Sequence, residues 1–203
     1  LKSADYAITE AGFGADLGAE KFLDIKCRIA KLKPSAVVIV ATVRALKMHG
    51  GLAKSELNEE NLVALEKGMP NLLRHVSNIK DVYKLPSVVA VNRFPTDTQA
   101  EIDLIIEKCK ELGVNVVLSD VWAKGSLGAV ELADEVVRLC ERENDFTYSY
   151  KTEKPIKDKI ESIVKKVYRG SGVSFTGNAI KQITELETLG FENLPVCIAK
   201  TQY

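Results

Sequence analysis

Residues 36–43 read AVVIVATV, a run whose first six positions are all apolar and mostly β-branched. Alternating apolar and polar residues are typical of a strand with one solvated face, whereas a continuous apolar run indicates a strand buried on both faces of a parallel sheet. Three further runs of this kind predict three further strands: YAIT at 6–9, SVVAVN at 87–92 and NVVLSD at 115–120.

Amphipathic helical patterns lie between these runs. In the clearest, which covers 97–113, Thr98 and Glu101 have the spacing of a capping box and Gly113 is a stop signal. The spacing predicts a helix with one face toward the sheet. The apolar stripe of this helix consists of Ile102, Ile105, Ile106 and Cys109.

Two other patterns complete the alternation. One covers 58–79 and contains Pro70, which predicts a kink or a break. The other covers 127–142 and follows the last apolar run. Since strand and helix alternate, we predict an α/β fold with a mostly parallel sheet and helices on both faces, like part of a P-loop NTPase or Rossmann fold.

The character of the sequence changes after about Asp145. Residues 146–172 predict a short strand and a Lys-rich amphipathic helix, and 174–190 predict one more helix. The chain begins without Met and closes on the strand-like PVCIAKTQY, so we expect a piece of a longer polypeptide. The expected parts are a main α/β domain at 1–145, a small α+β domain at 146–194, and a strand at 195–203 leading back to the main body or on to a further domain.

The composition argues against several functional classes. Lys and Arg together number 28 and so do Asp and Glu, which gives no electrostatic argument for binding nucleic acid or an anionic membrane. No run approaches the roughly 20 apolar residues that span a bilayer, and a signal-peptide pattern is lacking. The cysteines have no metal-binding or redox spacing, and we expect reduced thiols in a cytoplasmic protein: Cys27, Cys109, Cys140 and Cys197.

A glycine-rich loop, GFGADLG at 12–18, follows the first apolar run. Its spacing is one residue longer than the dinucleotide-binding fingerprint, and its acidic surroundings would repel a pyrophosphate. The phosphate loop G-x-x-x-x-G-K-[ST] occurs nowhere in the sequence. We therefore expect Gly12 and Gly14 to let the backbone approach a flat ligand, without binding its phosphates.

Three large aromatic residues follow predicted strands, namely Phe13, Phe94 and Trp122. Ligands of open α/β sheets bind beyond the carboxyl ends of the strands, where a ring is better placed for stacking than for core packing. Together the three rings predict a slot for a planar heterocycle. Taken singly, Phe13 and Phe94 could cap the core, and Trp122 could be a lone surface residue.

Basic residues follow the same strand ends. Arg44, Lys47 and Lys124 are candidates for contacting an anionic part of the ligand, although they could instead form a solvated basic rim. Asn92 and Asp97 faintly resemble the guanine-reading N-K-x-D motif, but their spacing is too long. The two histidines give no metal cluster, and no spacing supports a catalytic triad, so we assign no catalytic residue and no metal ligand.

The sequence motifs at these strand ends are long and specific enough to resemble one protein family. The chain closely resembles the formate–tetrahydrofolate ligases, in the bacterial single-function form, over Ser3 to Tyr203. Proteins of this family are much longer, with an ATP phosphate loop upstream of the region that this chain resembles. The resemblance is carried by ADYAITEAGFGADLGAEKF at 4–22, VIVATVRALKMHGG at 38–51, VVAVNRFPTDT at 88–98, VWAKG at 121–125 and NLPVCIAKTQY at 193–203.

The resemblance implies an activity: ATP-dependent ligation of formate to tetrahydrofolate, giving 10-formyltetrahydrofolate through formyl phosphate. The implied substrates are formate, tetrahydrofolate and ATP with Mg²⁺, and a monovalent cation is an implied option. The full-length protein would be cytoplasmic and homo-oligomeric, usually a tetramer. Family residues that hold formyl phosphate have no counterpart here, so we expect this chain alone to be nearly inactive.

The resemblance also implies which residues line the adenine and pterin site. In the family, the site is lined by the phenylalanine of a GFG motif, by the phenylalanine and proline of an N-x-F-P motif, and by the tryptophan of a WAKG motif. In this sequence these residues correspond to Phe13, to Phe94 with Pro95, and to Trp122. We expect Asn92, Leu118, Gly12 and Gly14 beside them.

Two other functions remain open. The chain could be a non-catalytic α/β module that binds a heterocycle or a partner protein through its aromatic edge. It could also be a scaffold or oligomerisation piece whose rings are buried against another subunit.

Overall fold

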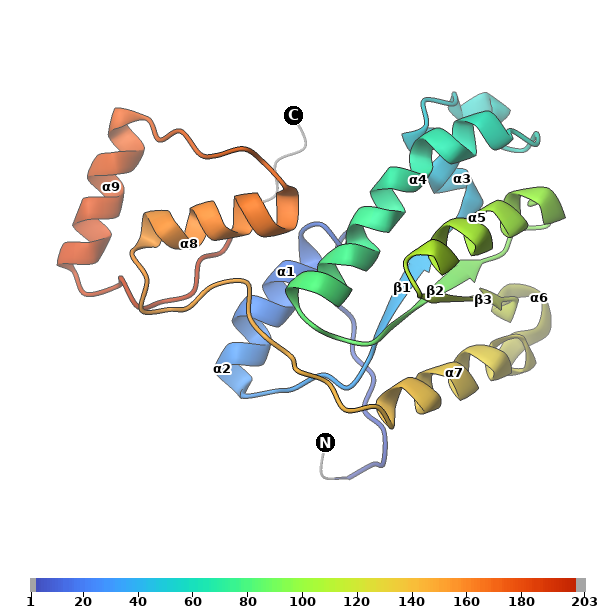
Figure 1. The fold of residues 1–203 in the computed structure, drawn as a ribbon, viewed down its shortest axis with the longest axis horizontal. Coiled ribbons are helices and arrows are strands. Elements are labelled where there is room, and N and C mark those ends of the chain that lie inside the picture. Colours follow the sequence, from blue (N-terminus) through green and yellow to red (C-terminus); the bar gives the residue numbers. More distant parts are fainter. Residues whose placement is uncertain (1–2, 200–203) are drawn as a thin grey trace. The chain divides into compact units, whose positions relative to one another are not determined.

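The computed structural model describes residues 3–199, which fall into two compact units. The central unit comprises 34–147, and the N/C unit combines the described parts of 1–33 and 148–203 (Figure 1). The sequence placed 1–33 in the main domain, whereas the structure groups this segment with the C-terminal part of the chain. Each unit is described by itself.

The central unit contains a three-stranded parallel sheet in the order β1-β2-β3. Its strands are β1 (Val37–Ala41), β2 (Ser87–Asn92) and β3 (Asn115–Ser119). The register pairs Val38 with Val88, and Val88 with Asn115. The continuous apolar runs therefore predicted these three strands correctly.

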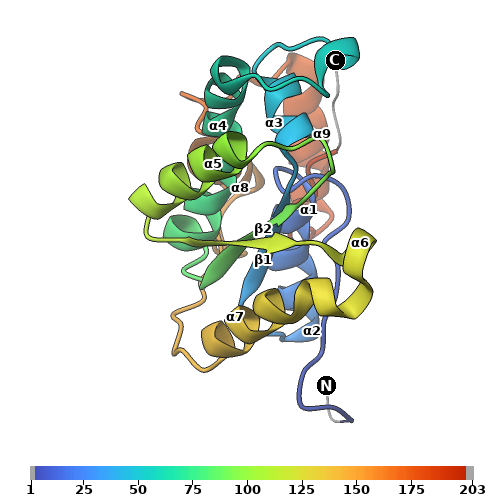
Figure 2. The same cartoon turned by 90° about the vertical axis from the view of Figure 1, so that its right-hand side faces the viewer.

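Helices cover both faces of this sheet. Helices α4 and α5 lie on one side and α7 on the other (Figure 2). The helices of the central unit are α3 (Val43–His49), η2 (Lys54–Glu56), α4 (Leu62–Ser77), η3 (Asn78–Val82), α5 (Gln99–Glu111), α6 (Val121–Lys124), η4 (Gly125–Ala129) and α7 (Val130–Cys140). The predicted α/β fold with helices on both faces is confirmed.

Burial differs between the central and edge strands. In β2, the side chains of Val88, Val89 and Val91 are fully buried, as expected for a strand with a neighbour on each side and helices on each face. In β1, Val38 and Val40 remain 40% and 68% exposed, so one face of this edge strand is open in the described structure.

Helix α4 packs closely against α3. A Cβ atom on Gly68 would lie 1.9 Å from the backbone oxygen of Leu46, so only glycine permits this approach. Contrary to the expected break, α4 continues through Pro70. Pro70 and Glu66 are both exposed, so water can reach the Glu66 carbonyl that the proline leaves without its usual helical donor.

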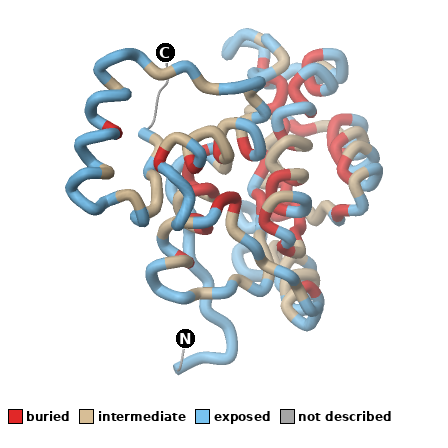
Figure 3. The backbone as a smooth tube through the Cα atoms, turned by 60° about the vertical axis from the view of Figure 1, so that its left-hand side comes forward, coloured by how far each residue is buried: buried red, intermediate tan, exposed pale blue. Residues whose placement is uncertain are grey.

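The N/C unit is helical. One continuous helix is built from α1 (Gly18–Lys21), η1 (Phe22–Cys27) and α2 (Arg28–Ala30), and a second from α8 (Ile156–Ile163) and η5 (Val164–Tyr168). The third, α9 (Gly177–Thr188), is almost wholly exposed, with only Ile183 buried (Figure 3). Within residues 3–199, no helix is both long and apolar enough to cross a bilayer.

Three expected strands do not form. Residues 6–9 have no regular structure, and Ile8 is 94% exposed, because a short apolar run is not a strand without a neighbour to pair with. Residues 146–151 are also irregular, and 195–199 likewise, while 200–203 lie outside the described residues. A side-chain bond joins the second and third of these segments instead: the backbone N–H of Val196 donates to the Tyr150 hydroxyl at 3.0 Å. The expected α+β appendage therefore has no strand within its described part.

Candidate functional site

The carboxyl ends of β1, β2 and β3 meet at one edge of the sheet, since the three strands are parallel. Helix α3 follows β1 there, the loop at 93–98 follows β2, and α6 follows β3. The backbone N–H of Arg93 donates to the carbonyl of Ser119 at 3.2 Å, which joins the ends of β2 and β3. This carboxyl edge is the candidate site.

The structure brings two of the predicted site residues together at this edge. The guanidinium carbon of Arg44, on α3, lies 5.6 Å from the ring centroid of Phe94, within the range of a cation–π interaction. Phe94 is 36% exposed, so its ring is accessible while Arg44 contacts it. An accessible ring next to a cation suits a planar ligand that also carries negative charge.

Trp122 and Lys124 lie on the short helix α6. Trp122 is 81% exposed, so its indole is not part of the core. Leu127, in the following 3-10 turn η4, is also largely exposed, at 79%. The ammonium of Lys124 forms a 3.0 Å ion pair with Asp120, and it remains largely exposed and accessible to an anion.

Lys47 is a correction to the sequence prediction. Its ammonium is not on a basic rim but fully buried, 2.8 Å from Oε1 of Glu101 and 2.8 Å from the carbonyl oxygen of Glu59. A ligand cannot reach it in this structure. The apolar pattern of α3 did not reveal this, because the partner Glu101 comes from α5, far along the chain.

Glu101 joins several segments beneath the edge. It accepts the backbone N–H of Asn61 at 3.1 Å and that of Thr98 at 3.1 Å, which completes the predicted capping box of α5. Burial alone would raise the pKa of Glu101. The hydrogen bonds from Lys47, Asn61 and Thr98 outweigh it and hold the pKa below its usual range.

Asp97 was not predicted as a site residue, yet it shapes the loop that carries Phe94. Its Oδ2 accepts the backbone N–H of Phe94 at 2.8 Å, and its own N–H donates to the Phe94 carbonyl at 3.0 Å. Asp97 is only 6% exposed, and this burial raises its pKa, against the lowering effect of the bond from Phe94. The sequence signal for it was Asp immediately before the helix cap Thr98, three residues after Phe94.

Three predicted residues have less distinctive positions. Asn92 ends β2 and is partly buried, Leu118 lies partly buried in β3, and Pro95 is exposed in the loop after Phe94. All belong to the carboxyl edge or the strand leading to it. Pro95 also has a conformational role, since proline favours the second position of the turn that runs from Phe94 to Asp97.

Phe13 lies in the N/C unit, in the glycine-rich loop. It is 73% exposed and has a positive φ of 66°, a conformation that is uncommon for a residue other than glycine and is enriched at functional sites. The Gly14 carbonyl accepts the N–H groups of Leu17 and Gly18, which forms the turn that leads into α1. Gly18 is required by packing, because a Cβ atom there would lie 1.6 Å from the Gly12 oxygen. A Cβ atom on Gly12 itself would contact nothing within 4 Å.

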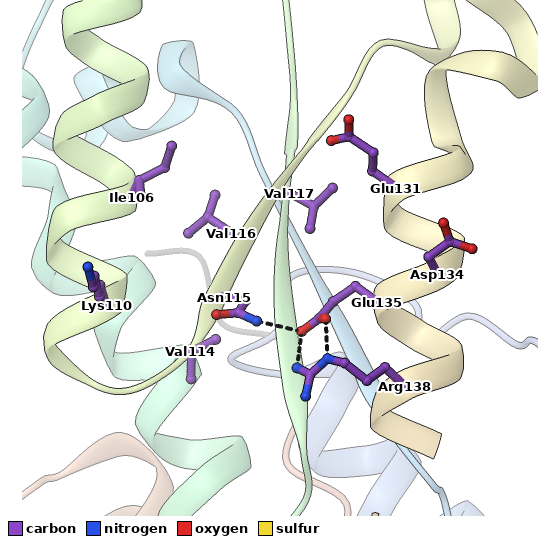
Figure 4. Close-up of a pocket in the computed structure, with 10 residues that line it drawn as sticks. All are labelled: Ile106, Lys110, Val114, Asn115, Val116, Val117, Glu131, Asp134, Glu135 and Arg138. Atoms are coloured by element: carbon purple, nitrogen blue, oxygen red, sulfur yellow. Dashed lines mark hydrogen bonds and ion pairs between the residues drawn. The ribbon is translucent and has the colours of Figure 1, made fainter. Parts of the chain in front are cut away.

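A groove of about 490 Å³ lies away from the carboxyl edge, toward the amino end of β3 (Figure 4). Three polar side chains of the groove are hydrogen-bonded to one another: the Glu135 carboxylate accepts two hydrogen bonds from Arg138 and one from Asn115. The bonds from Arg138 hold the pKa of Glu135 below its usual range. This groove is not built from the predicted site residues. Its lining comprises Ile106, Lys110, Val114, Asn115, Val116, Val117, Glu131, Asp134, Glu135 and Arg138.

The described residues contain no group of three His, Cys, Asp or Glu side chains placed to hold a metal ion. Separately, the side chains at this edge offer accessible rings, Phe94 and Trp122, and cations, Arg44 and Lys124.

Comparison with known families gives this arrangement a context. The model of the formate–tetrahydrofolate ligase family matches residues 1–203, which is the whole sequence, and the chain therefore belongs to the formate–tetrahydrofolate ligase family.

Proposed function

We propose that this chain supplies the ring-binding part of a formate–tetrahydrofolate ligase, which uses ATP to join formate to tetrahydrofolate and forms 10-formyltetrahydrofolate. The observation that carries the proposal is the carboxyl edge, where Arg44 contacts the accessible ring of Phe94 and the indole of Trp122 is exposed. The family match supports the reaction class, and the edge supports the location of the rings.

The proposed ligand contacts follow from the side chains at this edge. Phe94 and Trp122 stack on the adenine or pterin ring, and Asn92, Pro95 and Leu118 lie beside them. Arg44 and Lys124 contact anionic groups. For the N/C unit by itself, we propose that Phe13, Gly12 and Gly14 contact a planar ring, on the strength of the exposed Phe13 side chain and its unusual backbone.

The proposed chemistry passes through formyl phosphate. The amine N10 of tetrahydrofolate attacks the formyl carbon, the bond from that carbon to the phosphate oxygen breaks, phosphate leaves, and the proton of N10 is released to the phosphate or to solvent. Such acyl transfer needs alignment of the amine with the formyl carbon, which a rigid ring slot provides, and charge stabilisation at the phosphate. The sequence holds no phosphate loop, so we propose that these 203 residues alone bind rings but synthesise little product.

Further parts of the proposal rest on the family. ATP is used with Mg²⁺, a monovalent cation is an optional activator, and the complete enzyme is a cytoplasmic homo-oligomer. No residue of the central unit or the N/C unit is assigned to these ions.

The test uses Trp122, the sole tryptophan. The chain is titrated with tetrahydrofolate and separately with ATP, while Trp fluorescence is followed against free tryptophan as a control for light absorption by the ligand. We expect saturable quenching that is weakened at least tenfold in Phe94→Ala and unchanged in Phe191→Ala, whose ring is also exposed but lies in the N/C unit. Absence of saturable quenching by both ligands would contradict the proposed ring site.

A second candidate is a non-catalytic module that uses the same edge to bind a partner protein. The large exposure of Trp122 and Leu127 favours it, because large apolar side chains left open to solvent are common at protein interfaces. The partner of such a module can be a second copy of this chain, and sedimentation at increasing concentration tests that case. Self-association that Trp122→Ala abolishes, without any quenching by folate or ATP, would support a scaffold or oligomerisation piece whose rings are buried against another subunit.

A further inference from the structure

The loop after β2 is closed by its own first and last turn residues. The N–H of Asp97 donates to the carbonyl of Phe94 at 3.0 Å, and the N–H of Phe94 donates to Oδ2 of Asp97 at 2.8 Å. Pro95 occupies the position after Phe94, where its fixed φ favours such a turn. The backbone from which the Phe94 ring projects is therefore bonded on both sides to Asp97.

The burial of Asp97 is unusual for a turn residue. Its side chain is almost wholly buried, and its second oxygen, Oδ1, has no hydrogen-bond partner among the described residues. A buried carboxylate with one unsatisfied oxygen is costly. Nothing in the turn needs the negative charge itself, because the single bond to the Phe94 N–H needs only a neutral acceptor at this position.

The turn is also anchored to the rest of the central unit. Thr98, the next residue, caps α5, and Glu101 links that cap to the buried Lys47. At the other end, Arg93 is bonded to Ser119 of β3. Asp97 thus lies between the anchored cap of α5 and Phe94, whose ring belongs to the candidate site. Arg44 contacts that ring from α3.

We propose that Asp97 is a positioning residue, which holds the Phe94 ring at the carboxyl edge in the orientation that receives the planar ring of the ligand. The inference rests on the proposed function for its ligand and on the hydrogen-bond geometry of the turn for its mechanism. Asp97 itself touches no ligand, since Oδ1 and Oδ2 are both enclosed or bonded within the loop. A ring held in place before binding loses less conformational freedom when the ligand arrives, so its release weakens affinity without removing any contact residue.

The experiment compares Asp97→Ala, Asp97→Ser and Asp97→Asn with Thr96→Ala, an exposed position in the same turn. Three quantities are measured for each: the exchange rate of the Phe94 amide hydrogen by NMR, the Kd for tetrahydrofolate and for ATP by Trp122 fluorescence, and the urea midpoint of unfolding. The alanine variant should increase the exchange rate and the Kd about tenfold. Asparagine, whose amide oxygen can accept the Phe94 N–H, should restore both to within about threefold of the parent, with serine between them.

The outcomes separate the inference from the proposed function. If the parent chain binds neither ligand, the proposed function fails, and with it the ligand half of the inference, while the exchange rates still decide whether Asp97 holds the turn. If the parent binds and Asp97→Ala binds equally well, the inference alone is overturned. The inference would also be overturned if all three Asp97 variants lost affinity only in proportion to the fall in their urea midpoints. That result would indicate a purely structural role for Asp97. Should Asp97→Ala fail to fold, the comparison of the serine and asparagine variants decides.

Discussion

The ammonium of Lys47 lies 2.8 Å from Oε1 of Glu101, and both side chains are at most 1% exposed. The pair joins α3, which follows β1, to α5, which follows β2. Bonds from the backbone of Asn61 and Thr98 to the same carboxylate bring two loops into this arrangement. The ion pair thus supports both α3, which carries Arg44, and the loop that carries Phe94, and its own side chains are buried.

Removing one partner of this pair should destabilise the central unit strongly. Lys47→Met leaves the Glu101 carboxylate buried without its ion-pair partner, and we expect a loss of about 3–5 kcal/mol in the free energy of unfolding. The measurement is urea unfolding followed by far-UV circular dichroism. Lys108→Met is the matched control, since Lys108 pairs only with exposed carboxylates and should cost about 0–1 kcal/mol. An equal loss of unfolding free energy in Lys47→Met and Lys108→Met would contradict the structural role assigned to the Lys47–Glu101 pair.

Glu20 should make the N/C unit less stable as pH rises. Its carboxyl is fully buried, neither oxygen has a hydrogen-bond partner among residues 3–199, and burial, followed by the charge of Asp24, raises its pKa to about 7. Because the folded chain then holds a proton that the unfolded chain releases, stability is highest below pH 4.5 for this group and falls until about pH 7. The loss is at most on the order of 3 kcal/mol. This loss of stability can be measured as faster hydrogen exchange of the α1–η1 amides across this pH range.

Glu20→Gln removes the titrating group and should abolish that pH dependence. Above pH 7 the variant should protect the α1–η1 amides better than the parent. Glu185→Gln, on the exposed surface of α9, serves as the control and should leave the pH profile unchanged. A profile that keeps its slope in Glu20→Gln would show that another group is responsible.

Gly18→Ala should disrupt the glycine-rich loop. The added methyl group would lie 1.6 Å from the Gly12 oxygen, so the loop or the start of α1 must move, at a cost of about 1–3 kcal/mol or more. Gly12→Ala is the control in the same loop, because its methyl group meets nothing within 4 Å. Hydrogen exchange of the amides at 14–22 reports the difference. The explanation fails if the two variants exchange alike.

Arg44→Ala should weaken ligand binding modestly. In the proposed site Arg44 contacts an anionic group of the ligand, and an accessible ion pair of this kind contributes about 0.2–1 kcal/mol, which corresponds to an increase in Kd of up to about fivefold. Arg44→Lys should lie between the parent and the alanine variant, since lysine keeps the charge but not the planar group. Lys67→Ala, on the exposed side of α4, controls for a simple loss of positive charge. An unchanged Kd in Arg44→Ala would remove Arg44 from the site.

The sequence predicted well those features that depend on neighbours along the chain. The buried runs at β1, β2 and β3 and the capping box of α5 are local patterns, and all four are present. It failed where the deciding partner is distant. YAIT at 6–9 has the composition of a strand but no pairing strand, and Lys47 looked accessible because Glu101 lies 54 positions away. The position of Asp97, three residues after Phe94 and just before the helix cap, indicates a turn from local sequence alone. Its burial depends on tertiary packing and could not be predicted in this way.

The open face of β1 has a consequence for how the chain behaves in concentrated solution. Val38 and Val40 are exposed on a strand that pairs on one side only within the described sheet, and its sequence, VVIVA, has no charge and no proline. Such an edge can template pairing with the same strand of another molecule, and natural proteins usually guard it with a lysine or a cover. Association of β1 edges would compete with folding and would grow with concentration and time. A lysine at position 40 would place a charge on this face and should slow aggregation while leaving the carboxyl edge of the sheet intact.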